Sequence, residues 1–230
     1  MARPRNPLLS HERIVAAALR VIDEEGLAAL STRRLAAELG VSGPSLYNHF
    51  ATKDELLDAV VDSVVGEVDL SMLGRDPWPE ALRAWARSYR AALVAHPRLV
   101  PVLASGPGRR PHALRLADAV FGALVDAGWS PGEATRIGAL MRYLVLGSAL
   151  GSFAGGFPQD AAAYGDAYPH LGQAHLLAER QQQVDEGAFE TALDALLIGL
   201  RAKFPAGART QDQGSARRRK AGRSASSGAS

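Results

Sequence analysis

Apolar residues in the first third of the chain recur at steps of three and four, a spacing that places them on one face of a helix. One such run lies between Ser10, a suitable N-cap, and Gly26, a suitable stop. A second, shorter helix is predicted from Thr32 to Leu39, with Ser31 as its N-cap and Gly40 as its end. Signs of strands are scarce, so the pattern favours an all-helical chain.

The stretch GVSGPSLYNHF, residues 40–50, predicts a tight turn followed by another helix that carries Tyr-Asn-His. Gly40 can take the left-handed conformation that stops a helix, and Ser42 can cap the next one. Leu46 and Phe50 are four residues apart, so both are expected to face the core. Two helices joined by a three-residue turn are typical of the helix-turn-helix, whose second helix enters the major groove of DNA.

The remaining pattern is helical as well. Thr52 and Glu55 have the spacing of a capping box, which opens a fourth helix that runs to about Val68. Further helices are predicted at 77–95, 111–127, 130–153 and 186–204, with 98–103 as a short segment and 155–170 as a loop or weak helix. The helix at 111–127 is expected to bury Leu114, Ala117, Phe121, Leu124 and Val125.

These elements predict an all-α fold. An N-terminal three-helix helix-turn-helix DNA-binding domain, residues 1–68 with its linking fourth helix, is joined to a larger helical ligand-binding and dimerisation domain at 69–204. Residues 205–230 have little to bury and are predicted to form a disordered basic tail. Six Lys or Arg and one Asp lie in this tail, so a chain with a net charge of +2 carries −3 over residues 1–204. The run RRRK either attracts nucleic acid or is a solvated charge cluster.

Composition excludes several classes of protein. The chain has no cysteine, which rules out disulfides and thiolate chemistry and fits a reducing compartment. Charged residues interrupt the N-terminal apolar run, as Arg142 interrupts the apolar stretch 137–157, so neither a signal peptide nor a spanning helix is predicted. We therefore expect a cytoplasmic protein with no membrane partner.

The exposed face of the predicted reading helix holds residue types that suit DNA. Gly43 and Pro44 permit close approach, while Ser45 and Asn48 can form hydrogen bonds with base edges or phosphates. Phosphate contacts are expected from Thr32, Arg33, Tyr47, His49 and Lys53. The tyrosine or the histidine taken alone is equally consistent with a packed side chain. The prediction therefore rests on the arrangement of these residues.

The segment STRRLAAELGVSGPSLYNHFATKDELLDAV, residues 31–60, closely resembles the DNA-binding segment of the tetracycline-repressor family. The resemblance extends over about 10–65 and continues more weakly at 126–151 and 185–204. It implies a homodimeric, all-helical transcriptional regulator, usually a repressor that a small molecule releases from its operator. The family's DNA contacts map onto the residues above, with base reading between Ser42 and His49. Gly43 stands where the tetracycline repressors read a base with glutamine, so the operator is expected to differ.

The second domain is expected to bind the small molecule in an internal cavity. Candidate lining residues are Trp85, Tyr89, Leu103, Phe121, Met141, Tyr143 and Leu144, and candidate polar partners are His96, Arg142 and His112. A lone histidine or arginine in this setting is more often a surface or salt-bridged group than a ligand contact. The resemblance places Leu103 where the tetracycline repressors bind a drug-chelated magnesium through histidine. Leucine cannot bind a metal, so a largely apolar effector without metal is expected.

Two features favour association of two chains. Gly147, Gly151 and Gly155 recur every four residues, and the last helix is apolar over a broad face. The same features could instead serve packing within one chain. A homodimer has a functional logic, because two reading helices held about 34–36 Å apart read a palindrome.

An enzyme and a helical adaptor are the two alternatives to a DNA-binding regulator. The six histidines have no metal-binding spacing, and the sequence contains neither a nucleophile elbow nor a dinucleotide-binding glycine motif. We therefore predict no enzyme: no catalytic residue, no metal and no cofactor. A helical adaptor that binds only protein is the alternative, and salt-dependent binding to a DNA duplex would separate it from the regulator.

Overall fold

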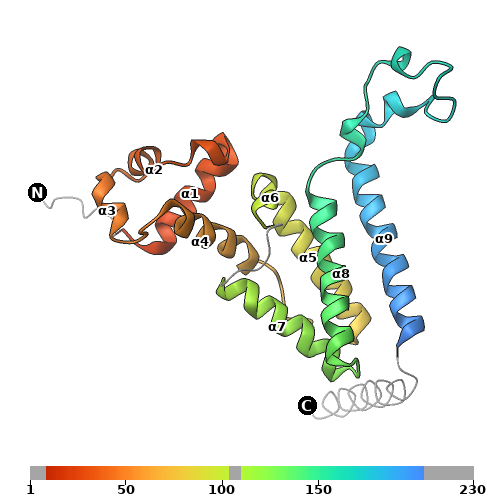
Figure 1. Ribbon diagram of the computed structural model, residues 1–230, viewed down its shortest axis with the longest axis horizontal. Coiled ribbons are helices and arrows are strands. Elements are labelled where there is room, and N and C mark those ends of the chain that lie inside the picture. The colour runs from red at the N-terminus through yellow and green to blue at the C-terminus, as the bar shows by residue number, and fades with distance from the viewer. Residues whose placement is uncertain (1–8, 104–109, 205–230) are drawn as a thin grey trace, which may run out of the picture. The chain divides into compact units, whose positions relative to one another are not determined.

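The computed structural model describes residues 9–103 and 110–204, and every regular element in them is helical (Figure 1). The expected all-α fold is confirmed for these residues. The predicted tail at 205–230 lies outside them. By its internal contacts the chain divides into two compact units. Among the described residues, unit 1 comprises 9–68, 91–103 and 110–116, and unit 2 comprises 69–90 and 117–204. One break between the units falls after residue 68, and the described residues of 91–116 associate with the N-terminal helices.

Unit 1 begins with the helices that the apolar pattern predicts. They are α1 (His11–Glu25), η1 (Leu27–Ala29), α2 (Thr32–Leu39), α3 (Gly43–Tyr47) and α4 (Lys53–Gly66). Ser10, Ser31 and Thr52 each accept a hydrogen bond from the backbone N–H three residues later, at 3.3, 3.2 and 3.0 Å. These hydrogen bonds satisfy helix-start donors that would otherwise lack a partner, so the three predicted N-caps are confirmed.

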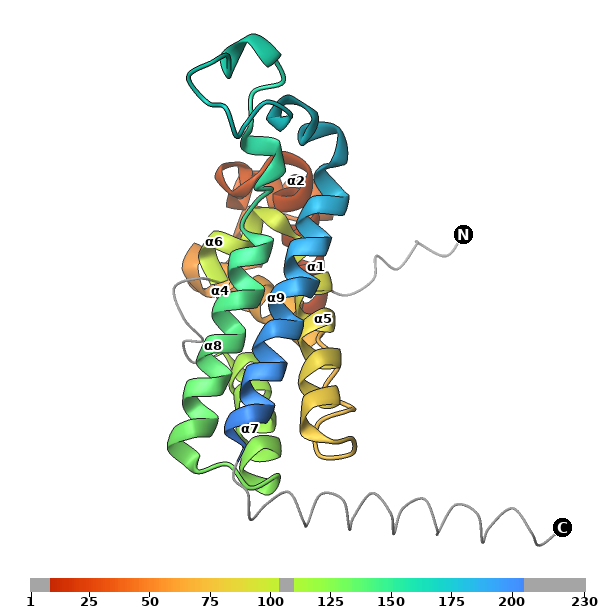
Figure 2. The same cartoon turned by 90° about the vertical axis from the view of Figure 1, so that its right-hand side faces the viewer.

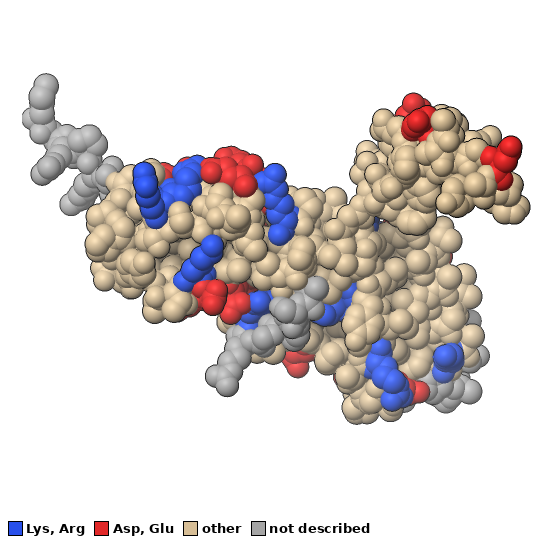
Figure 3. Space-filling model, turned by 45° about the horizontal axis from the view of Figure 1, so that its top comes forward, with Lys and Arg blue, Asp and Glu red and all other residues tan. Residues whose placement is uncertain are grey.

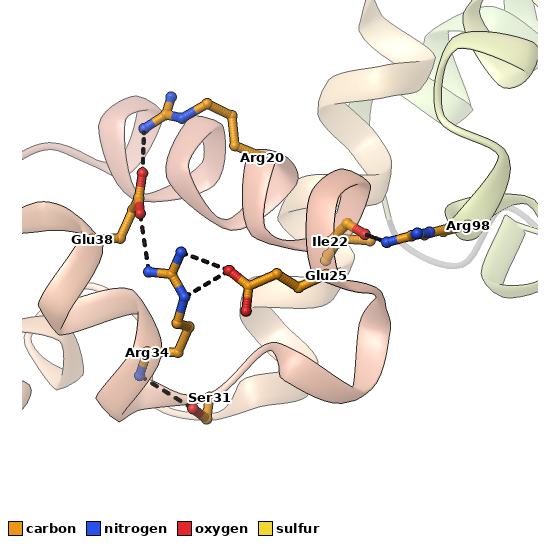
Figure 4. A network of polar contacts seen from close by, with 7 residues as sticks. All are labelled: Arg20, Ile22, Glu25, Ser31, Arg34, Glu38 and Arg98. Atoms are coloured by element: carbon orange, nitrogen blue, oxygen red, sulfur yellow. Dashed lines mark hydrogen bonds and ion pairs between the residues drawn. The ribbon is translucent and has the colours of Figure 1, made fainter.

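A charge network ties α1 to α2 (Figure 4). The guanidinium of Arg34 lies 2.6 Å from Glu25 and 3.0 Å from Glu38, and Arg20 lies 3.5 Å from Glu38. Hydrogen bonds from Arg34 lower the pKa of the Glu38 carboxyl. Because the side chains are exposed, the network orients the two helices more than it stabilises them.

Residues 91–116 add the end of α5 (Trp78–Ala95), η2 (Pro97–Leu99), α6 (Val100–Leu103) and the start of α7 (Pro111–Asp126) to unit 1. His96 Nδ1 lies 2.8 Å from Asp23 Oδ2. Arg98 donates at 3.2 Å to the carbonyl of Ile22, which also accepts from the Gly26 N–H at 2.8 Å at the end of α1. Helices α5 and α7 each begin in one unit and end in the other.

Unit 2 is built from the larger parts of α5 and α7 with α8 (Pro131–Ala149) and α9 (Gln181–Lys203). Helices α8 and α9 lie side by side (Figure 2). Glu190 and Arg87 form two hydrogen bonds of 2.7 and 2.8 Å that join α9 to α5. At one end, Trp78 contacts Trp129 and Phe204 with ring centroids 5.5 and 5.4 Å apart. These aromatic contacts close the core of unit 2.

Several boundaries and faces in unit 2 differ from expectation. Helix α8 ends at Ala149 and α9 begins at Gln181, earlier in both cases than predicted. Leu114 and Val125 on α7 are 50% and 39% exposed, whereas Ala113 and Val120 are buried. The buried face of α7 is therefore rotated relative to the predicted one.

The segment between α8 and α9 holds four short 3-10 turns, in agreement with the expected loop. They are η3 (Ala154–Gly156), η4 (Ala161–Ala163), η5 (Ala174–Leu176) and η6 (Ala178–Arg180). This segment projects beyond the paired helices (Figure 1). Gly151 and Gly155 belong to it rather than to α8, so the predicted glycine stripe does not lie on one helix. Across the described residues, no helix is long and apolar enough to cross a membrane.

Candidate nucleic-acid interface

The turn between α2 and α3 has the predicted geometry. Gly40 has φ 65° and ψ 35°, a left-handed conformation that glycine adopts without the steric cost of a Cβ. The N–H of Val41 then donates to the Ala36 carbonyl at 3.0 Å. Leu46 and Phe50 are 5% and 7% exposed, so both fill the core as predicted. This burial orients the opposite face of α3 outward.

Helix α3 is shorter than the sequence suggested. It ends at Tyr47, so Asn48 is its C-cap and His49 follows the helix rather than lying on it. Ser42 stands at the N-cap position but makes no capping hydrogen bond, which corrects the prediction. Its hydroxyl instead lies 2.7 Å from that of Ser45. The hydroxyl pair holds both serines at the outward-facing start of α3.

Tyr47 is the largest exposed group on this surface, with 59% of its area accessible. Its hydroxyl lies 3.4 Å from Thr32 Oγ1, so the end of α3 and the start of α2 meet there. Arg33, Pro44, Asn48 and Lys53 are exposed, and Gly43, Ser45 and His49 are half-buried. The ten predicted contact residues therefore all lie on unit 1, where Tyr47 contacts Thr32 and Ser42 contacts Ser45.

His49 has a packing role that sequence reasoning left open. Its ring lies 5.3 Å from that of His11, which in turn lies 4.6 Å from Phe50. The three rings join the start of α1 to the segment after α3. A substitution at His49 would therefore disturb packing as well as any phosphate contact.

Gly43 has no structural reason to be glycine. Its φ is not positive, and a Cβ built there would meet nothing closer than Thr32 Cγ2 at 4.0 Å. A larger residue would fit, so the absent side chain leaves the backbone open to close approach by a partner. On the face drawn in Figure 3, basic and acidic side chains occur in small groups rather than as one broad basic patch.

The predicted effector residues divide between the two units. In unit 2, Trp85, Tyr89 and Met141 are 2%, 3% and 0% exposed, and the Trp85 indole N–H has no hydrogen-bond partner. Phe121 packs against Gly138, where a Cβ would lie 2.3 Å from its ring. Tyr143 is 67% exposed, so its predicted position in the lining of an internal cavity is wrong. Its solvent-facing position follows from the three- and four-residue spacing that buries its neighbours on α8.

The other predicted polar partners have local roles. His96 contacts Asp23 and His112 contacts Asp62, all in unit 1, and Leu103 in the same unit is 2% exposed. Arg142 is half-buried on α8, as is Leu144. In the part of the chain that is described, no three His, Cys, Asp or Glu side chains converge as a metal site would require.

Sequence reasoning missed the contacts that join distant segments of unit 1. Three contacts were not singled out: Arg34 with its two glutamates, Arg98 with the Ile22 carbonyl, and Asp62 with His112. A signal was available on α4, because Asp58 and Asp62 are four residues apart and the residues between them, Ala59 to Val61, are apolar.

Comparison with known proteins identifies relatives of both units. Residues 14–60 match the bacterial regulatory proteins of the tetR family, and residues 71–204 match the tetracyclin repressor-like C-terminal domain. The tetracycline repressor protein class A from transposon 1721 of Escherichia coli is 34% identical over 200 residues, which cover 84% of this chain and 90% of that repressor.

Two further proteins are similar to the chain. An HTH-type transcriptional regulator of Saccharopolyspora erythraea is 35% identical over 142 residues. The match covers 62% of this chain and 60% of that relative's length. The crystal structure of the Streptomyces coelicolor TetR family protein ActR in complex with actinorhodin is similar with a TM-score of 0.68. It is 31% identical, and the match covers 86% of this chain and 99% of ActR.

Proposed function

This chain belongs to the tetR family of bacterial regulatory proteins and is a DNA-binding transcriptional regulator, and from that premise we propose that it is a homodimeric repressor. It binds a palindromic operator and is released by a small, largely apolar effector. The observation that carries the proposal is the outward face of the α2–turn–α3 unit, where Tyr47 is 59% exposed while Leu46 is buried.

A dimer is needed because α3 is short. Its five residues can reach the edges of few base pairs, so one unit provides little specificity. Two such helices, held about one helical turn of DNA apart, read both halves of a palindrome.

The dimer surface that we propose lies on α8 and α9. Leu140, Tyr143 and Ile198 are 44%, 67% and 67% exposed, an unusual amount of accessible apolar area for packed helices. Gly147 and Gly199 lie on the same two helices, and a Cβ at either would meet nothing within 4 Å. The missing side chains would let a second copy's helices approach closely.

The effector that we propose is an aromatic, polycyclic molecule with a few oxygen acceptors. Two of the similar proteins are a tetracycline repressor and an ActR structure with actinorhodin, which supports this class of ligand. The buried indole N–H of Trp85 has no partner in the protein, and an effector carbonyl or hydroxyl oxygen would remove the cost of leaving it unpaired. Leu103 cannot bind a metal, so release is expected to proceed without divalent cations.

Selection of bound duplexes from a random library tests the proposal directly. We expect enrichment of one inverted repeat, with affinity that falls steeply as salt rises. Aromatic polyketides should then release the enriched duplex equally well with magnesium and with a chelator. Failure to enrich any duplex would instead favour the protein-binding adaptor.

A further inference from the structure

Unit 1 holds a groove that none of the ten predicted DNA contacts lines. It has a volume of about 760 Å³ and lies between α1 and α4, which pack side by side, with the start of α7 also contributing. Its described lining residues all belong to unit 1, whereas the effector candidates Trp85, Tyr89 and Met141 belong to unit 2. A volume of this size is typical of a small-molecule site.

The apolar part of the lining is aliphatic. Val15, Ala16 and Leu19 are spaced so that they share one face of α1, and Ala59 lines the same groove from α4. Among the described lining residues there is no Phe, Tyr or Trp, so an aromatic cage for a compact cation is not provided. Methylene groups of a ligand would instead cover aliphatic surface, which is favourable because it removes that surface from water.

Carboxylates supply most of the charge around the groove. The five are those of Glu12, Glu55, Asp58, Asp62 and Glu67. One guanidinium opposes them, that of Arg110, so the described lining carries a net charge of −4 with its histidines neutral. This guanidinium lies 2.6 Å from Asp58. No Lys or Arg of the described residues forms an ion pair with the three glutamates, so their charge is available to a cationic ligand.

The carboxylates of α4 recur along the groove. Starting from Glu55, they follow at steps of three, four and five residues, at Asp58, Asp62 and Glu67. These steps correspond to rises of roughly 4.5, 6 and 7.5 Å along a helix. Nitrogens joined by three or four methylene groups have a similar separation. A linear polyamine therefore matches both parts of the lining, because ammonium groups donate to carboxylates while the methylene segments pack on aliphatic side chains.

We propose that this groove binds a linear polyamine, and that Glu12, Glu55 and Glu67 accept hydrogen bonds from its ammonium groups. The groove is then a second small-molecule site, located in the DNA-binding unit and separate from the effector site proposed for unit 2. Binding there requires neither operator nor effector. Its failure is therefore distinguishable from a failure of the proposed function.

Calorimetric titration of spermidine into the intact protein is the first test, and it is made without DNA because DNA also binds polyamines. We expect saturable binding that weakens as salt rises, since the carboxylates are largely exposed. Hexaamminecobalt(III) is the matched ligand, because it has the same charge as spermidine and no methylene groups. Spermidine should bind about fivefold more tightly. Equal or tighter binding of the cobalt complex would show attraction to acidic charge alone and would overturn the proposal.

Two substitutions locate the binding in the groove. Ala16→Phe places a ring over the aliphatic lining at an exposed position of α1, so spermidine should bind about tenfold more weakly. The control is Ala37→Phe, the same substitution at an exposed position of α2. Glu67→Gln removes one charge and should weaken binding about twofold to fivefold, whereas Glu179→Gln in unit 2 should not. Thermal scans establish that each variant is folded, and wild-type affinity in both groove variants would place the bound polyamine elsewhere.

The basic run RRRK, residues 217–220, is another cationic group that the groove could attract. A chain that ends at Phe204 separates this occupant from a polyamine. Equal spermidine affinity of the full and the shortened chain would support the proposal, whereas binding seen only after truncation would show that the run already occupies the groove and would overturn it. A full chain that selects an operator but shows no saturable spermidine binding would refute the polyamine site and leave the proposed function intact.

Discussion

Leu46 and Tyr47 are adjacent in the chain, yet one is buried and the other is 59% exposed. Sequence spacing predicted this contrast, because Leu46 and Phe50 share a helical face and the intervening residues do not. Two contacts could not be predicted in this way: Tyr47 with Thr32, and Ser42 with Ser45. Both depend on side-chain rotamers, which the spacing of residues does not encode.

Removing the ring of Tyr47 should weaken operator binding with little effect on folding. For Tyr47→Ala we expect a loss of about 1–3 kcal/mol per site in binding free energy, because an exposed tyrosine contributes to DNA contacts rather than to the core. Titration of labelled operator at fixed salt measures it. Tyr168→Ala is the control, since Tyr168 is 55% exposed in unit 2. Equal affinity of both variants would place the reading surface elsewhere.

Single helices were predictable where caps and apolar spacing agree, as in α1, α2 and α8. The start of α9 was missed because QQQVDE has no apolar periodicity, although α9 begins at Gln181. The exposed Leu114 of α7 was misassigned because several faces of that helix carry apolar residues. The contact between Asp62 and His112 joins residues 50 apart, which local patterns cannot reveal.

The pair between α5 and α9 predicts a dependence of stability on pH. Hydrogen bonds from Arg87 lower the pKa of the Glu190 carboxyl below its ordinary value of 4.5. Its stabilisation is therefore present above that value and is lost as pH falls through the lowered pKa. Since the two side chains are 52% and 40% exposed, we expect only about 0.2–1 kcal/mol from it.

Chemical unfolding of Glu190→Gln measures this contribution. The variant should be less stable than wild type at neutral pH, and the difference should shrink in acid. Glu179→Gln, an exposed position in unit 2, provides the control. A difference that grows in acid would contradict the assignment.

The capping box of α8 allows a second prediction about the stability of a helix. Ser130 Oγ accepts from the Glu133 N–H at 3.3 Å, and Glu133 accepts from the Ser130 N–H at 3.1 Å. Ser130→Ala should lower the free energy of unfolding by about 0.5–2 kcal/mol, while the dimer and its operator stay the same. Calorimetry measures the stability, and operator titration of the same preparation measures DNA binding. A variant as stable as wild type would show that this cap is dispensable.

The whole molecule should tolerate removal of residues 205–230. A chain that ends at Phe204 keeps that ring against Trp78 and Trp129, so we expect it to dimerise and to select the same operator. Its salt dependence should become shallower if the RRRK run contacts phosphates. A chain that ends at Ala202 loses the ring and should unfold at lower temperature. Loss of dimerisation in the Phe204 chain would show that the domain ends later.

The tryptophans offer a consequence for spectroscopy. The chain has three, at positions 78, 85 and 129, and all of them belong to unit 2. Their fluorescence therefore monitors unit 2, while far-UV circular dichroism averages over the helices of both units. If the two units melt together, the two signals will give superimposable transitions. If unit 1 melts first, ellipticity will fall before the emission changes. The protein thus carries an intrinsic probe of whether effector stabilises one half of it or the whole.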